Sequence, residues 1–289
     1  MKTTELDIAA NGLVLKGSLC TPEAASWPLV VMCHGLLSHR NSSKYRFLAQ
    51  TLAARNIASL RFDFRGCGES EGELQESTVS ARWHDLRCVI AAARRLRGFD
   101  GCLGLLGSSL GGFLVLLELS RSSSPYPAAA WATPSSLLEL ESRLESSPLP
   151  LGPAFIQDLR QYEILPALAT VSRTLLIHGL DDTLVPARHA RLLYEALAPP
   201  KCLHLLPGAD HRISQPEWRQ RAAALTVDWF ANYFFIPSYL LLQSPQTVFT
   251  RFHLITTPST YKADIFLAEA SGVPILRVAK KFLQLQRWL

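Results

Sequence analysis

Residues 104–112 read GLLGSSLGG, a pair of serines that follows an apolar run and is enclosed by glycines. The apolar residues 102–106 are typical of a buried strand, and residues 110–120 have a helical period. The serines therefore lie at a sharp turn from a strand into a helix. The pattern G-x-S-x-G also fits an ordinary glycine turn with a capping serine, but the strand before it and the helix after it favour a nucleophile.

Steric demand selects one of the two serines. A strained turn that pushes a hydroxyl into solvent brings the residues two before and two after it into contact, so both must be tiny. Ser109 has Gly107 and Gly111 at those positions, whereas Ser108 would have leucines there. Ser109 is therefore the candidate nucleophile, and Gly112 is expected to let the helix approach the strands closely.

Around this turn the chain alternates between short apolar runs and helical periods. Two β-rich pieces, residues 5–9 and 13–19, flank the hairpin signal Asn11-Gly12. The apolar runs follow at residues 29–33, 57–62, 102–106, 128–132, 174–177 and 202–206. The helical periods lie near residues 44–55, 78–97, 110–120, 187–197 and 216–233. This alternation predicts an α/β fold with a mostly parallel central sheet, helices on both faces, and the N-terminal antiparallel hairpin at the sheet edge.

One long interval interrupts the alternation, between the runs at 128–132 and 174–177. Its sequence, which includes TPSSLLELESRLESSPLPLGP, predicts one short helix around residues 136–145 followed by a Pro/Gly-rich connection. Such an excursion is where an α/β fold carries a lid or pocket wall. We expect a single domain over residues 1–235 with a short cap at about 133–166.

Composition excludes several classes of protein. With 289 residues, 48% of them hydrophobic, the chain is long enough for one sizeable core. Its net charge of +5 is spread thinly, so no nucleic-acid partner is expected. The start MKTTELDIAANG lacks the apolar core of a secretory signal, and no run of about 18 apolar residues predicts a spanning helix. The six cysteines show no CxxC or His-rich spacing, which predicts reduced thiols in the cytoplasm and no metal site.

A serine needs a histidine to take its proton and an acid to orient that histidine. Two later strand ends carry such residues. The stretch TLLIHGLDDTLVP places Asp181 and Asp182 in a turn after one strand, and CLHLLPGADHRIS places Asp210 and His211 in a loop after the next. The carboxyl ends of strands are where the sites of open α/β sheets gather. The order and spacing therefore suit a serine, an acid and a histidine.

Over residues 5–233 the chain resembles the α/β-hydrolase superfamily, and most of all its small bacterial esterases related to cinnamoyl/feruloyl esterases and to serine-aminopeptidase-like hydrolases. The family's acid lies in an H-G-x-x-D-x-x-V-P stretch, similar to HGLDDTLVP here, which selects Asp182. Its histidine lies in a G-A-x-H loop, similar to GADH here, which selects His211. The resemblance implies the catalytic set Ser109, Asp182 and His211, with Asp210 as a loop-fixing residue.

An oxyanion hole needs two backbone N–H donors aimed at the charge that develops on the attacked carbonyl. We expect one donor from Leu110, directly after the nucleophile. The loop CHGLLSHRNS contains a His-Gly pair similar to the family's, and the resemblance implies a second donor from Leu36. The side chains of Leu36 and Leu37 are then free to form a wall of the substrate pocket.

A further segment strengthens the resemblance without adding chemistry. The stretch RFDFRGCGESEG at residues 61–72 is similar to the family's R-x-D-x-R-G-x-G-x-S, which implies a rigid turn beside the oxyanion loop built by Asp63, Arg65, Gly66, Gly68 and Ser70. A phosphate cradle is the rival interpretation of these glycines, but neither G-x-x-x-x-G-K-[ST] nor a G-x-G-x-x-G that opens a helix is present.

Other candidate bases and nucleophiles are expected to be structural. His34 precedes the oxyanion donor, His204 lies on a strand and His189 is expected on a helix surface. Cys33 lies within a strand and away from the glycine turn, so it is expected in the core.

Residues 236–289 extend beyond the last helix that the fold needs. They hold six basic residues against two acidic ones, and within them residues 275–289 predict an amphipathic helix with a basic face. Three interpretations remain open: packing on the protein's own surface or at a homodimer contact, peripheral binding to an anionic membrane, or a segment foreign to the family.

Together the motifs predict a serine hydrolase that cleaves carboxylic esters without a cofactor, acting on a small-molecule substrate with a small or medium acyl or aryl group. Thioester, peptide and acyl-transfer chemistry would use the same residues. A non-catalytic relative that uses the fold to bind ligands is the alternative from another class. The motifs do not specify the natural ester.

Overall fold

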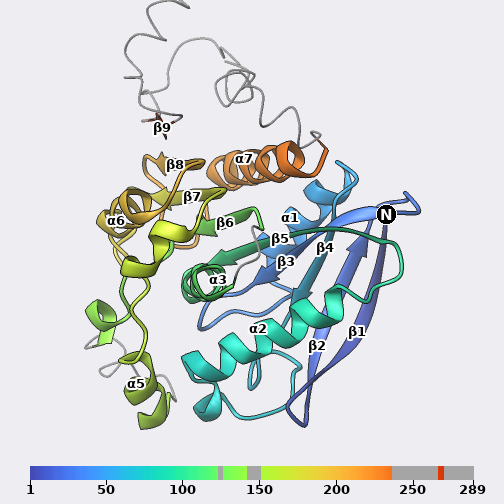
Figure 1. The fold of residues 1–289 in the computed structure, drawn as a ribbon, viewed down its shortest axis with the longest axis horizontal. Coiled ribbons are helices and arrows are strands. Elements are labelled where there is room, and N and C mark those ends of the chain that lie inside the picture. Colours follow the sequence, from blue (N-terminus) through green and yellow to red (C-terminus); the bar gives the residue numbers. More distant parts are fainter. Residues whose placement is uncertain (123–125, 142–150, 236–265, 270–289) are drawn as a thin grey trace, which may run out of the picture.

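The computed structural model describes residues 1–122, 126–141, 151–235 and 266–269 (Figure 1). Within these residues, nine strands form one sheet in the order β1-β2-β4-β3-β5-β6-β7-β8-β9. The strands are β1 (Lys2–Ala10), β2 (Leu13–Thr21), β3 (Trp27–Cys33), β4 (Ala58–Phe62), β5 (Phe99–Ser108), β6 (Ala128–Trp131), β7 (Thr174–Gly179), β8 (Lys201–Leu206) and β9 (Phe266–Glu269). The predicted runs therefore lie on strands, with ends displaced by a few residues.

The direction of the strands follows the sequence expectation. From β4 across β3, β5, β6 and β7 to β8 all neighbours are parallel. The pair β1 and β2 is antiparallel, lies at the sheet edge and turns at Asn11 and Gly12, which adopt φ values of 48° and 80°. The predicted hairpin is confirmed, because its turn residues tolerate positive φ.

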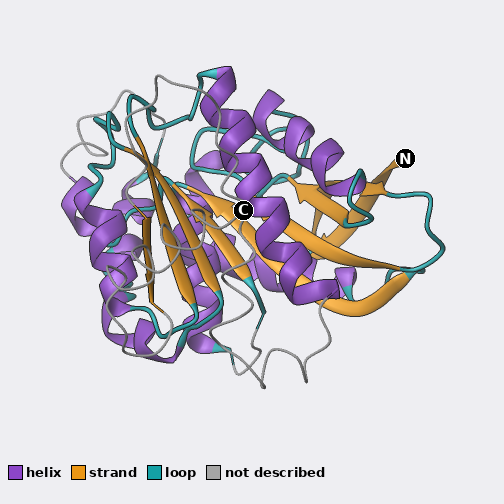
Figure 2. Cartoon of the chain, turned by 90° about the horizontal axis from the view of Figure 1, so that it is seen from above, coloured by secondary structure: helices purple, strands orange, loops and turns teal. Residues whose placement is uncertain are grey.

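Helices cover both faces of the sheet (Figure 2). They are α1 (Ser43–Ala53), α2 (Val79–Ala93), α3 (Leu110–Arg121), α5 (Pro153–Leu159), α6 (Arg188–Ala196) and α7 (Pro216–Phe235), with 3-10 turns at η1 (Leu74–Glu76), η2 (Leu138–Leu140) and η3 (Leu165–Thr170). The five helical periods of the sequence correspond to α1, α2, α3, α6 and α7.

Two apolar cores explain why the parallel strands show no polar alternation. In β3, Leu29 and Val31 belong to the core that α2, α3 and α6 cover, while Val30 and Met32 belong to the core that α1 and α7 cover. Every residue of β3 is buried. Strands buried on both faces read as continuous apolar runs, as the sequence indicated.

The cap differs from its predicted form. Of the helix expected around residues 136–145, the described part contains the 3-10 turn η2, and residues 142–150 lie outside the described part. The expected Pro/Gly-rich connection instead contains α5, which Pro153 opens at its first turn. Proline suits that position because its fixed φ is helical and the missing N–H has no partner there in any helix.

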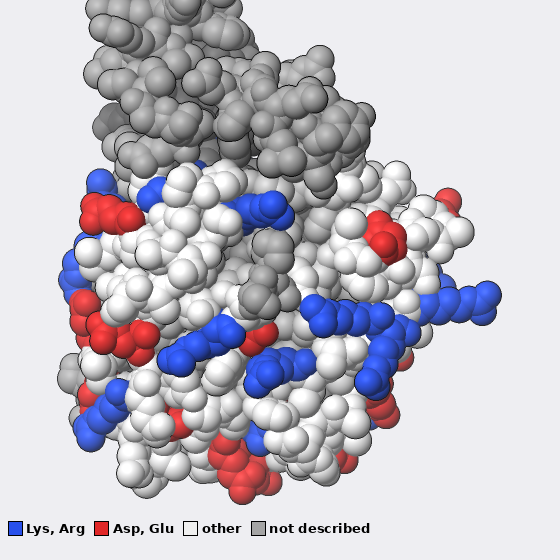
Figure 3. Space-filling model, in the orientation of Figure 1, with Lys and Arg blue, Asp and Glu red and all other residues white. Residues whose placement is uncertain are grey.

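The tail contributes a ninth strand that the sequence did not predict: β9 pairs antiparallel with β8. The amphipathic helix expected at residues 275–289 lies outside the described residues. None of the described helices combines the length and hydropathy needed to cross a membrane. On the face drawn in Figure 3, positive and negative side chains are interspersed among uncharged ones. All six cysteines are free thiols.

Candidate active site

Ser109 lies at the turn between β5 and α3 in a backbone conformation that few residues adopt. Its φ of 56° and ψ of −125° are a strained combination for a residue with a side chain. A Cβ on Gly107 would overlap the carbonyl group of Gly111, and one on Gly111 would overlap the carbonyl of Cys33. A Cβ on Gly112 would overlap the side chain of Thr133 at the end of β6. The predicted steric role of the three glycines is confirmed.

The structure brings the three candidate catalytic side chains into one hydrogen-bonded chain. Ser109 Oγ lies 3.1 Å from His211 Nε2, and His211 Nδ1 lies 2.7 Å from Asp182 Oδ2. Asp182 follows β7 and is buried, whereas its neighbour Asp181 is exposed. Asp210 instead accepts hydrogen bonds from the Ser214 amide and hydroxyl, at 2.8 and 2.6 Å, which fixes the loop that carries His211.

Asp182 is held as a carboxylate. Burial by itself would raise its pKa, but hydrogen bonds from His178 and His211 and from the backbone N–H of Val185 outweigh burial and keep the pKa below its usual range. The amides of Leu184 and Val185 donate to Oδ1 at 3.0 and 2.8 Å. This leaves Oδ2 directed at His211.

His178, at the end of β7, was part of the matched motif but had no assigned role. Its Nε2 lies 2.7 Å from the Val185 carbonyl oxygen and 3.3 Å from Asp182 Oδ2. The side chain is fully buried. A histidine four residues before an aspartate in a strand-to-turn segment was the sequence signal for this contact.

The loop after β3 carries the candidate oxyanion donor Leu36. The Phe64 amide donates to His34 Nε2 at 3.1 Å, so His34 Nδ1 carries the proton and donates to the Gly35 carbonyl oxygen at 2.7 Å. Burial first, and the nearby Arg82 second, lower the pKa of His34 to about 3. His34 is therefore a neutral structural residue, as expected.

The segment at residues 61–72 braces this loop. The buried Asp63 accepts from the backbone N–H of Arg40 at 2.6 Å and from its guanidinium. A Cβ on Gly68 would overlap the Asp63 carboxylate. Arg82, fully buried and not singled out from the sequence, reaches the Leu36 carbonyl oxygen at 3.4 Å. Asp63 and Gly68 thus form the tight turn expected beside the oxyanion loop.

A pocket of about 670 Å³ opens over Ser109. One part of its lining is apolar and consists of Leu36, Leu37, Leu110, Pro134, Leu137, Phe155, Leu184 and Val185. Leu36 and Leu37 thus both line this cavity. Leu37 is 56% exposed and Leu184 47% exposed, so this apolar part reaches the surface after a short distance.

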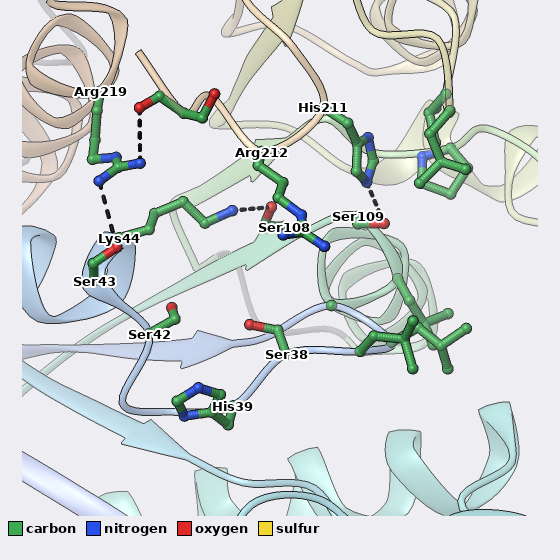
Figure 4. Close-up of a pocket in the computed structure, with 18 of the residues that line it drawn as sticks. Ser38, His39, Ser42, Ser43, Lys44, Ser108, Ser109, His211, Arg212 and Arg219 are labelled. Atoms are coloured by element: carbon green, nitrogen blue, oxygen red, sulfur yellow. Dashed lines mark hydrogen bonds between the residues drawn. The ribbon is translucent and has the colours of Figure 1, made fainter. Parts of the chain in front are cut away.

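The other part of the lining is polar and basic, which the sequence did not indicate (Figure 4). It consists of Ser38, His39, Ser42, Ser43, Lys44, Ser108, Arg212, Ser214 and Arg219. Lys44, in the first turn of α1, donates to Ser108 Oγ at 2.8 Å. Burial, followed by the nearby charges of Arg219 and Arg212, lowers the pKa of Lys44 to about 8. The three cations come from three separate segments, so no local run of basic residues announced them.

The remaining candidates are structural, with one correction. Cys33 is buried in β3, and burial raises its thiol pKa. His204 is buried on β8. His189 is not on a helix surface: it is fully buried, and its Nδ1 lies 2.9 Å from Ser135 Oγ at the base of the cap. No local sequence pattern indicates that the segment at Ser135 covers this face of α6. Among the described residues, no group of three His, Cys, Asp or Glu side chains could hold a metal ion.

Parts of this sequence are similar to a known protein family and to individual proteins. The family model for serine aminopeptidase, S33, matches residues 25–159. An uncharacterized 31.7 kDa protein of Escherichia coli is 36% identical over 86 residues, or 29% of this chain and 30% of its own length. The human palmitoyl-protein thioesterase ABHD10 is 26% identical over 183 residues, or 55% of this chain and 58% of its own length. The chain thus spans less than two thirds of these relatives.

Among solved structures, Est1E from Butyrivibrio proteoclasticus with bound ferulic acid has a TM-score of 0.69 and 17% sequence identity. The match covers 78% of this chain and 99% of that one. At this level of identity the similarity establishes the shared fold.

Proposed function

We propose that this chain, which has the α/β-hydrolase fold and matches the serine aminopeptidase S33 family model over residues 25–159, is a serine hydrolase that cleaves carboxylic esters through an acyl-enzyme. The observation that carries the proposal is the hydrogen-bonded chain from Ser109 Oγ through His211 to the buried Asp182, at the floor of a pocket. A serine, a base and an orienting acid in that sequence of contacts form the arrangement that acyl transfer requires.

In the first half of the reaction Ser109 Oγ attacks the ester carbonyl carbon while its proton passes to His211 Nε2. Asp182 holds the imidazole by accepting from Nδ1–H and stabilises the imidazolium that forms. His211 then gives the proton to the leaving alcohol oxygen as the C–O bond breaks. In the second half, water loses a proton to His211 and attacks the acyl-enzyme, which releases the carboxylic acid and restores Ser109.

The backbone amides of Leu36 and Leu110 are the proposed oxyanion donors. Both residues line the pocket beside Ser109. Within the described residues neither amide donates to a protein acceptor, whereas the Ser109 amide already donates to the Trp131 carbonyl oxygen at 2.8 Å. Preorganised, unsatisfied amides at this place would stabilise the negative charge on the attacked carbonyl oxygen, an effect worth about 3 kcal/mol per donor.

A fluorophosphonate probe, which phosphonylates activated serines, tests the proposal. We expect one label on the wild-type protein, and peptide mapping by mass spectrometry should find it on Ser109 and not on the adjacent Ser108. Ser109→Ala should abolish labelling, while Ser120→Ala, on the far turn of α3, should label like the wild type. An unlabelled wild-type protein, or unchanged labelling of Ser109→Ala, would refute the proposal.

Thioester cleavage is the second candidate function, because one relative is named a palmitoyl-protein thioesterase. The same residues would serve, since the triad fixes the mechanism and not the leaving group. Butyrate esters and butyrate thioesters with matched leaving groups distinguish the two. A kcat/KM at least tenfold higher for the thioester, relative to the uncatalysed hydrolysis of each substrate, would favour this candidate.

A further inference from the structure

The basic part of the pocket has no role in the acyl-transfer chemistry. Lys44, Arg212 and Arg219 come from α1, the β8–α7 loop and α7, and all three line the pocket. Lys44 and Arg212 lie beside Ser108, and Arg219 lies beside Ser43 at the start of α1 (Figure 4). Of the described residues, no aspartate or glutamate lines this pocket. Positive charge is therefore concentrated in a cavity whose floor holds the candidate nucleophile.

Among the described residues these cations have no carboxylate within ion-pair distance, although the charge of Asp210 is near enough to favour the ammonium of Lys44. Arg219 donates instead to the carbonyl oxygens of Ile213 and Ser214, and Lys44 donates to Ser108 Oγ. The nearby Arg219 and Arg212 disfavour the charged form of Lys44, and a bound anion would offset this repulsion.

The start of α1 adds uncharged hydrogen-bond donors to the basic part of the pocket. Ser42 precedes the helix, and its hydroxyl is buried and has no hydrogen-bond partner among the described residues. The Ser42 side chain does not accept a capping hydrogen bond, so it leaves the first backbone N–H groups of α1 available as donors. Free amides and the positive end of the helix dipole favour an anion at this position.

We call the pocket surface formed by Lys44, Arg212 and Arg219 the basic wall. Its position relative to His211 indicates which half of the ester carries the anion. Arg212 directly follows His211, and His211 Nε2 must reach the leaving oxygen to protonate it. The leaving alcohol therefore lies toward Arg212, and the acyl group is left with the apolar residues such as Leu137 and Phe155.

We propose that this pocket takes esters whose leaving alcohol carries an anionic group, a carboxylate or a phosphate, bound by Lys44, Arg212 and Arg219. This substrate class rests on the proposed ester hydrolysis and adds the specificity that the catalytic residues do not define. Charge-assisted hydrogen bonds from these cations supply the discrimination against neutral alcohols.

Matched butyrate esters test the proposal. The set comprises 3-carboxyphenyl butyrate, its neutral methyl ester, 3-phosphonooxyphenyl butyrate, and phenyl hydrogen succinate, which carries the anion on the acyl half. At neutral pH and low salt, kcat/KM for the two anionic-alcohol esters should exceed that of the methyl ester by about tenfold or more. Arg212→Gln and Arg219→Gln should each lower this ratio several-fold, and 0.5 M NaCl should lower it as well.

Arg191→Gln is the matched control, since Arg191 is exposed on α6 and does not line the pocket. It should keep the wild-type ratio. A ratio near one, a ratio unaffected by the two pocket variants, or an equal preference for the succinate ester would overturn the proposal.

A binding measurement separates this inference from the proposed function. Calorimetry of Ser109→Ala with benzoate and with phenyl phosphate reports the basic wall without turnover. We expect both anions to bind, and to bind several-fold more weakly when Arg212→Gln is added. Absence of binding would refute the anion site even if neutral esters are hydrolysed. Binding without fluorophosphonate labelling or turnover of the wild-type protein would refute only the proposed hydrolysis.

Discussion

His178 Nε2 lies between two acceptors of the loop that follows its own strand, 2.7 Å from the Val185 carbonyl oxygen and 3.3 Å from Asp182 Oδ2. Oδ2 is also the atom that His211 contacts. His178 therefore helps to fix both the course of the loop and the rotamer of the Asp182 carboxylate that contacts His211. In the proposed reaction His178 would act through Asp182, since its hydrogen-bonding contacts are with the Val185 carbonyl and Asp182 and not with Ser109.

His178→Phe keeps an aromatic ring of similar size and removes the donor. We expect kcat on a simple ester to fall about 10- to 100-fold with little change in KM, because a misplaced carboxylate lets the imidazole rotate away from Ser109. Steady-state kinetics measures both constants. His204→Gln, a change at another buried strand histidine that lies apart from this chain of contacts, should leave kcat near the wild-type value. A rise in KM alone for His178→Phe would contradict the positioning role.

Gly107→Ala should prevent the turn that carries Ser109. The added methyl group would overlap backbone atoms of Gly111, which has no flexible side chain to move aside. We expect a loss of unfolding free energy of at least about 3 kcal/mol, together with loss of esterase activity. Gly152→Ala is the control, because its Cβ would meet only Gln75 atoms at 3.4 Å or more. Denaturant unfolding followed by circular dichroism should show a wild-type midpoint for the control.

The parts of the structure that sequence predicted are those fixed by local chemistry. Gly107 and Gly111 selected Ser109 because the steric demand of the turn acts within five residues. The parallel strands were visible because strands buried on both faces are continuously apolar, as β3 is. The site residues Asp182 and His211 lie in short loops at strand ends, where topology gathers them whatever the details of packing.

Features that arise from contacts distant in sequence were not predictable in the same way. The basic wall combines Lys44 with Arg212 and Arg219, and only the packing of α1 beside α7 brings them together. His189 is buried because the cap segment at Ser135 covers it, and its helical period alone suggested a surface position. The strand β9 depends on pairing with β8 across more than sixty residues of sequence.

Asp182 should make the free energy of unfolding decrease at acid pH. Its pKa is lower in the folded protein than in the unfolded chain, so its stabilising contribution is complete above the unfolded value of about 4 and is lost as the pH falls through the folded value. At pH 6 the free energy of unfolding of the wild type should be about 2 kcal/mol higher than that of Asp182→Asn. Below pH 4 this difference should become smaller. Urea unfolding from pH 6 to pH 3 measures it. A difference that stays constant over this range would contradict the lowered pKa.

Lys44 should make anion binding sensitive to alkaline pH. Because its pKa is lowered to about 8, the ammonium is present below that value and is lost as the pH rises through it. Arginine side chains keep their charge over this range, and the pKa of the nearby Asp210 is lowered, so its carboxylate stays ionised. The Kd of benzoate should therefore be constant up to about pH 7 and increase several-fold by pH 9.5. Lys44→Arg keeps a charge throughout and should remove this dependence. An unchanged slope in Lys44→Arg would assign the pH effect to another group.

The extent of the apolar lining sets the preferred acyl length. Leu137 and Phe155 are buried, but Leu37 and Leu184 lie at the rim, so an acyl chain leaves the apolar part of the pocket after a few carbons. Each CH₂ that stays in the pocket contributes about 0.8 kcal/mol, and each one beyond the rim contributes almost nothing. Across p-nitrophenyl esters from acetate to palmitate, used below their micelle concentrations and corrected with Ser109→Ala, kcat/KM should rise from acetate, reach its maximum at small or medium chains and then decline. A maximum at palmitate would contradict this prediction, because it would show that the acyl chain follows a longer apolar path than the one described.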